Sequence, residues 1–349
     1  MSKNRYFSIL ETLEENKDNP SNPNDRILIV DGLNTFIRAF AANPVTNDDG
    51  IHVGGITGTL MSIGYAIKNI KPTRVIVCFD GKGGSQRRRK IFPEYKANRR
   101  VRSRLTRHGN HNTLEDESLS MKQQLMRCAQ YMQQLPLTVL SVENIEADDS
   151  MAYISQQIYP DSQKFIMSTD RDFLQLVSDK VHVWSPTKKK FYFKETIMEE
   201  YGIPSHNFLL YRTIEGDASD NIPGIRGAGR KTIANRIPII TEDRTVTIDE
   251  IIDFTEKNSK YKILKTISES KELLNMNYKL MQLNDVDISG SAKTKIMDTV
   301  RSPIQRLVKY EFQKMVLEDK INGSIKNPDL WLKQVFLPLD SYAGMTHDK

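Results

Sequence analysis

The sequence has few of the residues that build disulfide frameworks or zinc sites. Its 349 residues include two cysteines, Cys78 and Cys128, and six histidines. Cys78 lies in an apolar run and Cys128 in a helical pattern, so we expect two buried free thiols. The histidines form no HExxH or similar pairing, which argues against a zinc enzyme.

Long apolar runs are also missing. No run approaches the roughly 18 residues that cross a bilayer. The segment from Met1 to Pro23 is polar and lacks the apolar centre of a secretory signal. We therefore expect a cytoplasmic protein.

Short apolar runs are present, and they predict strands buried on both faces of a parallel sheet. These runs cover residues 27–30, 74–79, 137–142 and 164–168. Apolar stripes at 56–70 and 121–135 predict amphipathic helices that cover the sheet. Residues 181–184 and 191–193 predict a hairpin at its edge. The alternation of strands and helices predicts an α/β fold with a mainly parallel sheet, and the pattern after about Tyr201 is mostly helical.

Several predicted strands end in a carboxylate or lead into a carboxylate cluster. The carboxyl ends of parallel strands share one edge of a sheet, so these groups would converge there. Their mutual repulsion would be relieved by divalent cations, and two Mg²⁺ ions would form a phosphodiester hydrolysis site. Each carboxylate alone is as well explained as a turn residue or helix cap; their joint occurrence favours metal. The candidates are Asp31, Asp80, Glu146, Asp148, Asp149, Asp170, Asp172, Asp217 and Asp220.

These segments also carry a family resemblance. The chain resembles the 5′-nuclease family of flap endonucleases, polymerase-linked 5′ exonucleases and phage-type ribonuclease H. The matching segments are Ile29-Val30-Asp31-Gly32, Cys78-Phe79-Asp80-Gly81-Lys82, Glu146-Ala147-Asp148-Asp149, the run from Ser168 to Leu176, and the run from Gly216 to Gly224. Their order and spacing match over roughly residues 27–237. The resemblance implies a PIN-like, mainly parallel twisted sheet flanked by helices, with a helical arch and a helix–three-turn–helix.

The resemblance implies two groups of metal ligands. Asp31, Asp80, Glu146 and Asp148 would hold the ion that activates water. Asp170, Asp172 and Asp217 would hold the second ion, with Asp220 as a further candidate. Asp149 would lie between the two groups. Mg²⁺ is the expected metal, and Mn²⁺ a substitute.

A basic segment follows Asp80. Ten of the residues from 87 to 107 are Lys or Arg, within a chain of net charge +6 and pI about 9.0. Such a segment suits a polyanionic partner, although composition alone also fits a solvated loop. The resemblance implies a helical arch that passes a single-stranded 5′ end. Lys96 and Arg99 would then contact the scissile phosphate with help from Arg87, and Arg88 and Tyr95 would contact the nucleic acid.

A glycine-rich turn at residues 222–234 precedes a short predicted helix. Glycines let backbone N–H groups approach a phosphate. The alternative is a structural helix cap followed by a new helix. The resemblance implies a helix–three-turn–helix that grips duplex DNA without base preference. The expected contacts are Gly227, Gly229, Arg230, Lys231 and Thr232.

Four regions are expected: a flexible tail (1–24), an α/β nuclease domain (25–200, with an arch at about 82–117), a DNA-binding region (201–240) and a helical C-terminal region (241–349). The length leaves no room for a polymerase domain. The tail before Asp31 departs from eukaryal and archaeal flap endonucleases, which favours the stand-alone bacterial or phage class. Residues 334–339 are expected to pack locally, the alternative being a motif for a sliding clamp.

The resemblance implies a monomeric 5′→3′ exonuclease and flap endonuclease that removes RNA primers, in the host cytoplasm if a phage encodes it. Its partners would be DNA with 5′ flaps or nicks and RNA–DNA hybrids. A sliding clamp and a single-strand-binding protein are further candidate partners. Two other functions remain open: a non-catalytic module that binds branched nucleic acid, and a PIN-type ribonuclease that cuts single-stranded RNA.

Overall fold

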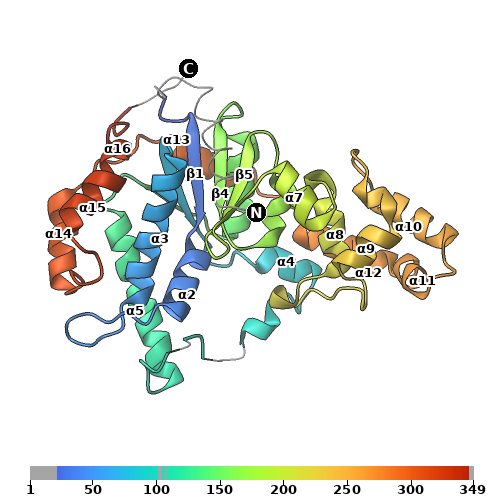
Figure 1. The fold of residues 1–349 in the computed structure, drawn as a ribbon, viewed down its shortest axis with the longest axis horizontal. Coiled ribbons are helices and arrows are strands. Elements are labelled where there is room, and N and C mark those ends of the chain that lie inside the picture. The colour runs from blue at the N-terminus through green and yellow to red at the C-terminus, as the bar shows by residue number, and fades with distance from the viewer. Residues whose placement is uncertain (1–21, 101–103, 107, 346–349) are drawn as a thin grey trace.

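A six-stranded sheet forms the centre of the computed structural model, which describes residues 22–100, 104–106 and 108–345 (Figure 1). The strand order is β3-β2-β1-β4-β5-β6. The first five strands are parallel, and β6 runs antiparallel to β5. The strands are β1 (Arg26–Asp31), β2 (Arg74–Phe79), β3 (Thr138–Ser141), β4 (Gln163–Met167), β5 (Val181–Ser185) and β6 (Lys190–Tyr192).

The central strand β1 shows why these apolar runs form a doubly covered sheet. Ile27 and Ile29 pack in one hydrophobic cluster, while Leu28 and Val30 pack in a second cluster on the other face. All four side chains are fully buried. A strand buried on both faces is apolar at every position, as the sequence indicated. The predicted parallel sheet and the edge hairpin are confirmed.

Helices cover both faces of the sheet. One face carries α2 (Gly32–Ala42), α3 (Gly54–Ile70), α5 (Leu114–Met132), α14 (Lys309–Glu318), α15 (Pro328–Val335) and α16 (Leu337–Asp340). The other cluster includes α6 (Ala147–Gln157), α7 (Lys194–Tyr201), α8 (Phe208–Glu215), α9 (Arg230–Arg236), α10 (Ile248–Lys257), α11 (Lys262–Ser268), α12 (Lys271–Met281) and α13 (Gly290–Arg301). A short helix, α4 (Gln86–Ile91), lies beside α12.

The helices α9 to α12 gather at one end of the long axis, and α14 to α16 lie at the other (Figure 1). The predicted C-terminal region therefore divides between the two faces of the sheet. The predicted boundary after residue 200 falls inside α7, and the one after 240 falls inside the 3-10 helix η5 (Pro238–Thr241). The domain division itself stays a prediction.

Both ends of the described chain join the fold. Most of the predicted tail, residues 1–21, lies outside the described residues. Asn24, however, is buried and accepts a hydrogen bond from Arg74 Nε at 2.9 Å, so the last residue of the predicted tail belongs to the fold. Phe336 and Leu339 are buried, which confirms that residues 334–339 pack locally. Among the described residues, no helix is both long and apolar enough to cross a membrane.

Candidate active site and nucleic-acid interface

Carboxylates from five separate chain segments meet at the carboxyl edge of the sheet. They line a cavity of about 700 Å³. Asp31 ends β1, and Asp80 and Asp170 follow β2 and β4. Asp148 lies in the first turn of α6. Asp220 comes from the 3-10 helix η4 (Ala218–Asp220).

Local hydrogen bonds hold these carboxylates in place. Asp31 caps α2 by accepting from Asn34 N at 3.0 Å, and its other oxygen accepts from Ser168 Oγ at 3.0 Å. Asp80 accepts from the backbone N–H of Ala147 at 2.7 Å, which ties β2 to the start of α6. The capping explanation and the metal-site explanation are thus compatible, because a carboxylate that caps a helix keeps further lone pairs for a cation.

Burial at this edge disfavours negative charge. It raises the pKa of Asp31 to about 7, with further repulsion from Asp170 and Asp80. Burial, then repulsion from Asp170 and Asp31, raises the pKa of Asp148. A set of carboxylates that repel one another, ranging from the buried Asp31 to the exposed Asp80, fits a hard divalent cation, which would neutralise them.

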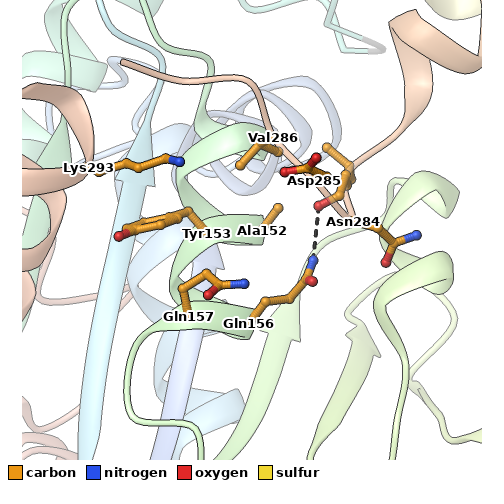
Figure 2. A pocket seen from close by; sticks show the side chains of 9 residues that line it. Ala152, Tyr153, Gln156, Gln157, Asn284, Asp285, Val286 and Lys293 are labelled. Carbon is orange, nitrogen blue, oxygen red and sulfur yellow. Dashed lines mark hydrogen bonds between the residues drawn. The ribbon is translucent and has the colours of Figure 1, made fainter. Parts of the chain in front are cut away.

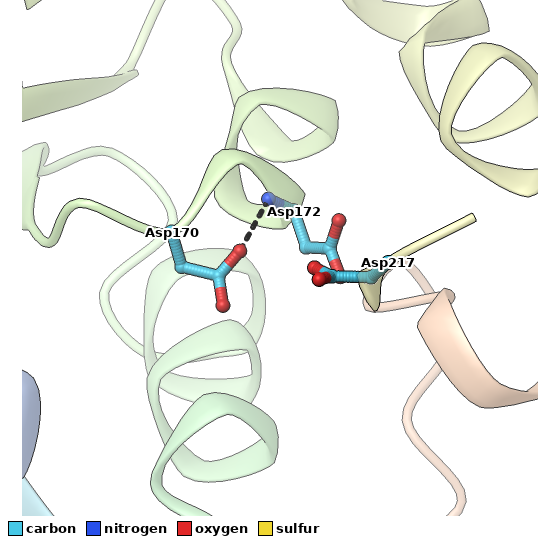
Figure 3. Close-up of side chains that lie close together, drawn as sticks. All are labelled: Asp170, Asp172 and Asp217. Carbon is cyan, nitrogen blue, oxygen red and sulfur yellow. Dashed lines mark hydrogen bonds between the residues drawn. The ribbon is translucent and has the colours of Figure 1, made fainter. Parts of the chain in front are cut away.

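A second acidic group lies beside the first. One oxygen from each of Asp170, Asp172 and Asp217 lies within 4.8 Å of the others (Figure 3). Burial and repulsion from Asp170 raise the pKa of Asp172 to about 7. The pKa of Asp217 is lowered although burial opposes this, because Ser219 and Arg212 favour its charged form.

Arg212 links the members of this second group, and sequence analysis missed it. Its Nε lies 2.7 Å from Asp172 Oδ1, and its Nη2 lies 2.6 Å from Asp217 Oδ2. Its Nη1 lies 2.5 Å from Glu215 Oε2. The side chain is 1% exposed. The available signal was an arginine that follows the apolar start of α8, Phe208–Tyr211, since a cation buried there needs anionic partners.

Two cations of the predicted arch also line the cavity. Lys96 Nζ lies 2.6 Å from Glu146 Oε1 and 3.8 Å from Asp220 Oδ2. Arg99 forms an ion pair with Asp220 and has a half-exposed side chain. Arg87 does not line the cavity and instead pairs with Asp149, with its Nη2 at 3.0 Å from Asp149 Oδ1. The structure thus brings Lys96 and Arg99 to the carboxylates, and pairs Arg87 with one carboxylate.

Glu146 and Asp149 are more deeply buried than the other expected ligands that pair with cations, since both side chains are 2% exposed. The two oxygens of Asp149 accept four hydrogen bonds from Arg87 and Arg88. This arrangement does not support a place for Asp149 among the metal ligands. Glu146 contacts Arg88 and Lys96, which lower its pKa although burial opposes this. Its expected role as a ligand stays a prediction and requires one of these cations to move.

Two of the expected nucleic-acid contacts, Arg88 and Tyr95, are buried in this structure, so their contact with a substrate stays a prediction that requires a movement of this segment. Arg88 is 3% exposed and donates through Nε to the carbonyl of Leu280 at 2.8 Å. Tyr95 is 2% exposed, with its hydroxyl 3.2 Å from Asp220 Oδ2. The face of α4 that carries Arg88 packs against α12, so neither side chain is free to meet a substrate in this conformation. Both hold the acidic residues in place instead.

The glycine-rich turn lies between α8 and α9, as predicted. Gly227 has a φ of +88°, which favours glycine, and no atom beyond its chain neighbours lies within 4 Å of where a Cβ at Gly229 would be. Arg230 and Lys231 are exposed, and Thr232 is half-buried. Arg230 Nη1 also donates to the carbonyl of Glu200 at 2.8 Å. The turn therefore presents open backbone next to exposed cations.

Comparisons with known proteins agree with this geometry. Residues 26–202 match the family model described as the N-terminal resolvase-like domain of 5′-3′ exonucleases. The 5′-3′ exonuclease of Bacillus subtilis is 29% identical over 271 residues, covering 75% of this chain and 84% of that protein. The 5′-3′ exonuclease of Aquifex aeolicus is 28% identical over 302 residues, covering 84% and 96%.

A solved structure shows the same fold. It is the flap endonuclease of bacteriophage T5 in a pseudo-enzyme–product complex with DNA and metal ions. The TM-score is 0.61 and the identity 25%, over 85% of this chain and 99% of that one.

Proposed function

Because this chain belongs to the 5′-3′ exonuclease family, we propose that it hydrolyses DNA and RNA–DNA duplexes at or near a free 5′ end, by a mechanism that uses two metal ions. The observation that carries the proposal is the meeting of carboxylates from five chain segments with Lys96 and Arg99 around one cavity. Removal of RNA primers and cleavage of 5′ flaps are the proposed reactions.

Two groups of ligands are proposed for Mg²⁺, with Mn²⁺ as a substitute. Asp31, Asp80 and Asp148 form the first group, together with Glu146 once Lys96 or Arg88 has moved away. Asp170, Asp172 and Asp217 form the second, with Asp220 beside them. When bound, the ions supply a water of lowered pKa and stabilise negative charge on the phosphate.

The chain's own cations are proposed to position the phosphate. Lys96 and Arg99 lie at the cavity and pair with Glu146 and Asp220. A phosphate that enters the cavity would compete with these carboxylates for both cations. The cations would then favour the charge that develops on the phosphate oxygens. Arg87 would support them by holding Asp149 and the start of α6.

Duplex binding is proposed for the glycine-rich turn. The backbone at Gly227 and Gly229 is open to a close approach, and Arg230, Lys231 and Thr232 follow directly. Contacts of this kind are made with phosphates, which carry no sequence information, so the protein would select a nucleic-acid shape rather than a base sequence.

The test compares the unaltered protein with Asp148→Asn on a labelled 5′-flap DNA duplex and on an RNA-primed duplex, with Mg²⁺. The expected result is Mg²⁺-dependent cutting near the junction or the 5′ end of both substrates. Asp148→Asn should lose cutting by about 1,000-fold or more, because it removes one ligand charge from the cavity. Asp298→Asn, on the exposed side of α13, is the matched control and should cut normally.

The same experiment separates the other two candidate functions. Tight binding without cutting by the unaltered protein, in Mg²⁺ and in Mn²⁺, would indicate a non-catalytic module for branched nucleic acid. Preference for free single-stranded RNA over a flap would indicate a PIN-type ribonuclease. Cutting that survives EDTA would contradict the proposed use of metal.

A further inference from the structure

A cluster of exposed cations lies where α10 ends and α11 begins. Residues 257–265 contain four lysines and one tyrosine and no acidic residue. We propose that this basic corner, formed by Lys257, Lys260, Tyr261, Lys262 and Lys265, binds the phosphate backbone of the duplex arm beyond the glycine-rich turn. The proposal rests on the proposed function, since it adds a second contact with the same substrate.

The basic corner continues the surface of the glycine-rich turn. Ile263, at the start of α11, lies 3.8 Å from the position that a Cβ at Gly227 would take. The guanidinium of Arg236, at the end of α9, lies 4.4 Å from the ring centroid of Tyr261. The end of α9 and the start of α11 therefore form one exposed surface, at the end of the molecule that carries α9 to α12 (Figure 1).

Three of the four lysines of the basic corner have no carboxylate partner among the described residues. Within the described part of the chain, no carboxylate oxygen lies within 4 Å of the ammonium groups of Lys257, Lys260 or Lys262. Lys265 has one such contact, with Glu269 at 3.7 Å. Lys260 instead lies over the ring of Tyr261, at 5.3 Å from its centroid. Tyr261 is 41% exposed, and its ring lies close to the cationic groups of both Arg236 and Lys260.

The opposite end of the molecule provides the contrast. Several exposed lysines there have carboxylate partners: Lys309 and Lys333 pair with Asp329, and Lys320 pairs with Asp49. A surface that only needs solubility can mix both signs, as this end does. A surface that leaves several like charges unpaired next to a phosphate-binding turn is suited to a polyanion. Duplex nucleic acid is the polyanion that the neighbouring turn is proposed to bind.

Two other cavities do not support a proposal about a ligand. A pocket of about 270 Å³ lies between α6 and the segment before α13, where Gln156 Nε2 donates to the carbonyl of Leu283 at 3.0 Å (Figure 2). Its lining is polar and no buried, unpartnered group points to a ligand. A second, apolar groove beside Tyr65 and Trp331 has nothing that indicates its occupant.

The experiment measures binding of the full chain in EDTA by fluorescence anisotropy, on flap substrates whose duplex arm spans about one or about two helical turns. The variant is Lys257→Ala/Lys260→Ala/Lys262→Ala. It should bind the long arm at least about tenfold more weakly. The slope of log Kobs against log salt should become less steep by about 2–3, which is roughly 0.9 for each phosphate that no longer contacts a lysine. The loss of affinity should be smaller for the short arm, and the single-turnover cutting rate at saturation should not change.

Two further variants make the result decisive. Lys314→Ala/Lys326→Ala/Lys333→Ala removes three lysines from the opposite end and should leave both affinities unchanged. Lys260→Glu alone should also weaken binding of the long arm. This single variant tests the proposal even if the triple variant does not fold. Equal affinity of the triple variant and the unaltered protein for the long arm, or an equal loss in the control, would overturn the proposal. If the unaltered protein neither cuts nor binds a flap, this result contradicts the proposed function itself, and the basic corner would then have no such substrate to bind.

Discussion

The carboxylate edge of the sheet and the helical lobe of α9 to α12 differ in whether their charged side chains are buried or exposed. At the edge, Glu146, Asp149 and Arg212 are almost fully buried, and each has partners of opposite sign. In the lobe, Lys231, Lys257 and Lys260 are exposed. One region encloses its charges in pairs, and the other presents them to solvent.

The difference indicates how each region works. A buried charge interacts strongly and only in one geometry, so the loss of a single partner leaves the other charge uncompensated. An exposed cation acts through its contribution to a shared field and is screened by salt. We therefore expect substitutions at the edge to be severe and specific to position, and substitutions in the lobe to be mild, additive and sensitive to salt.

The largest effect is expected at Arg212. Arg212→Gln removes the buried cation between Asp172 and Asp217, so metal-free protein should lose about 3–5 kcal/mol of stability. Mg²⁺ can replace the missing positive charge, so the rise in Tm on adding Mg²⁺ should be larger in the variant than in the unaltered protein. Thermal melts in EDTA and in Mg²⁺ measure both effects.

Two variants sharpen this result. Arg212→Lys keeps the charge without the planar fork and should fall between the other two proteins. Arg127→Gln breaks a partly exposed pair with Asp319 and should cost at most about 1 kcal/mol. If Arg212→Gln melts in EDTA at the temperature of the unaltered protein, the guanidinium does not hold this acidic group together.

A smaller effect, on the reaction rather than on stability, is expected at Lys96. Lys96→Ala removes a cation from the cavity and should lower kcat by about 100-fold. Affinity for a flap in EDTA should change little, because many other cations still hold the substrate. Single-turnover kinetics and anisotropy separate the two. Lys90→Ala, which changes an exposed lysine on α4, is the control and should cut normally. If Lys96→Ala lost affinity and kept its kcat, Lys96 would act in substrate binding, as the lobe residues do, and not in the reaction.

The lobe should show the reverse pattern. Arg230→Ala/Lys231→Ala should weaken binding by about tenfold and lower the salt slope by about 2, with kcat unchanged at saturation. Binding titrations at several salt concentrations measure this. Lys295→Ala/Arg301→Ala on α13 removes two exposed cations elsewhere and serves as the control. If Arg230→Ala/Lys231→Ala lowered kcat and left the affinity unchanged, it would contradict the expectation that the lobe acts in binding and the sheet edge in the reaction.

The smallest effect on the reaction is expected at His182, away from both regions. It lies in β5 at 4% exposure, and neither ring nitrogen has a hydrogen-bond partner in the described part of the chain. Burial lowers its pKa to about 4. The unfolded chain, with a pKa near 6.5, therefore binds the proton more readily, so stability falls as pH drops below about 6.5 and this contribution levels off below about pH 4.

The expected loss from this group is about 3 kcal/mol over that range, since one pKa unit corresponds to about 1.4 kcal/mol. His182→Phe, between Phe165 and Phe193, should be less sensitive to acid and should cut normally at pH 8. Urea unfolding at pH 7.5 and pH 5 measures the difference. Identical acid sensitivity of both proteins would show that His182 is not the titrating group.

The sequence predicted the sheet and most of the acidic edge correctly, for a physical reason. Residues 27–30 of β1 are buried on both faces and are all apolar, and an aspartate follows within three residues of the end of the apolar run in β1, β2 and β4. Asp31, Asp80 and Asp170 were found in this way. The metal and substrate roles assigned to them stay predictions.

Sequence analysis did not predict the surroundings of residues whose environment is set by distant segments. Arg88 belongs to a run of basic residues that looks exposed, yet its guanidinium meets Leu280 of α12 and Asp149 of α6. Asp149 looks like Asp148, its neighbour, but faces two arginines instead of the cavity lined by Asp148. Local sequence cannot separate such neighbours, because consecutive residues on a helix point about 100° apart and only the packing decides which faces inward.

By itself, the sequence determined which segments become strands, which carboxylates end at their common edge, and which stretch carries the basic and glycine-rich residues. These depend on patterns local to the chain. Only the tertiary structure decided which charges are enclosed in pairs and which stay exposed, as Arg212 and Lys260 show. The free energy of a charged group depends on its burial and on its partners, and those partners come from segments far along the chain.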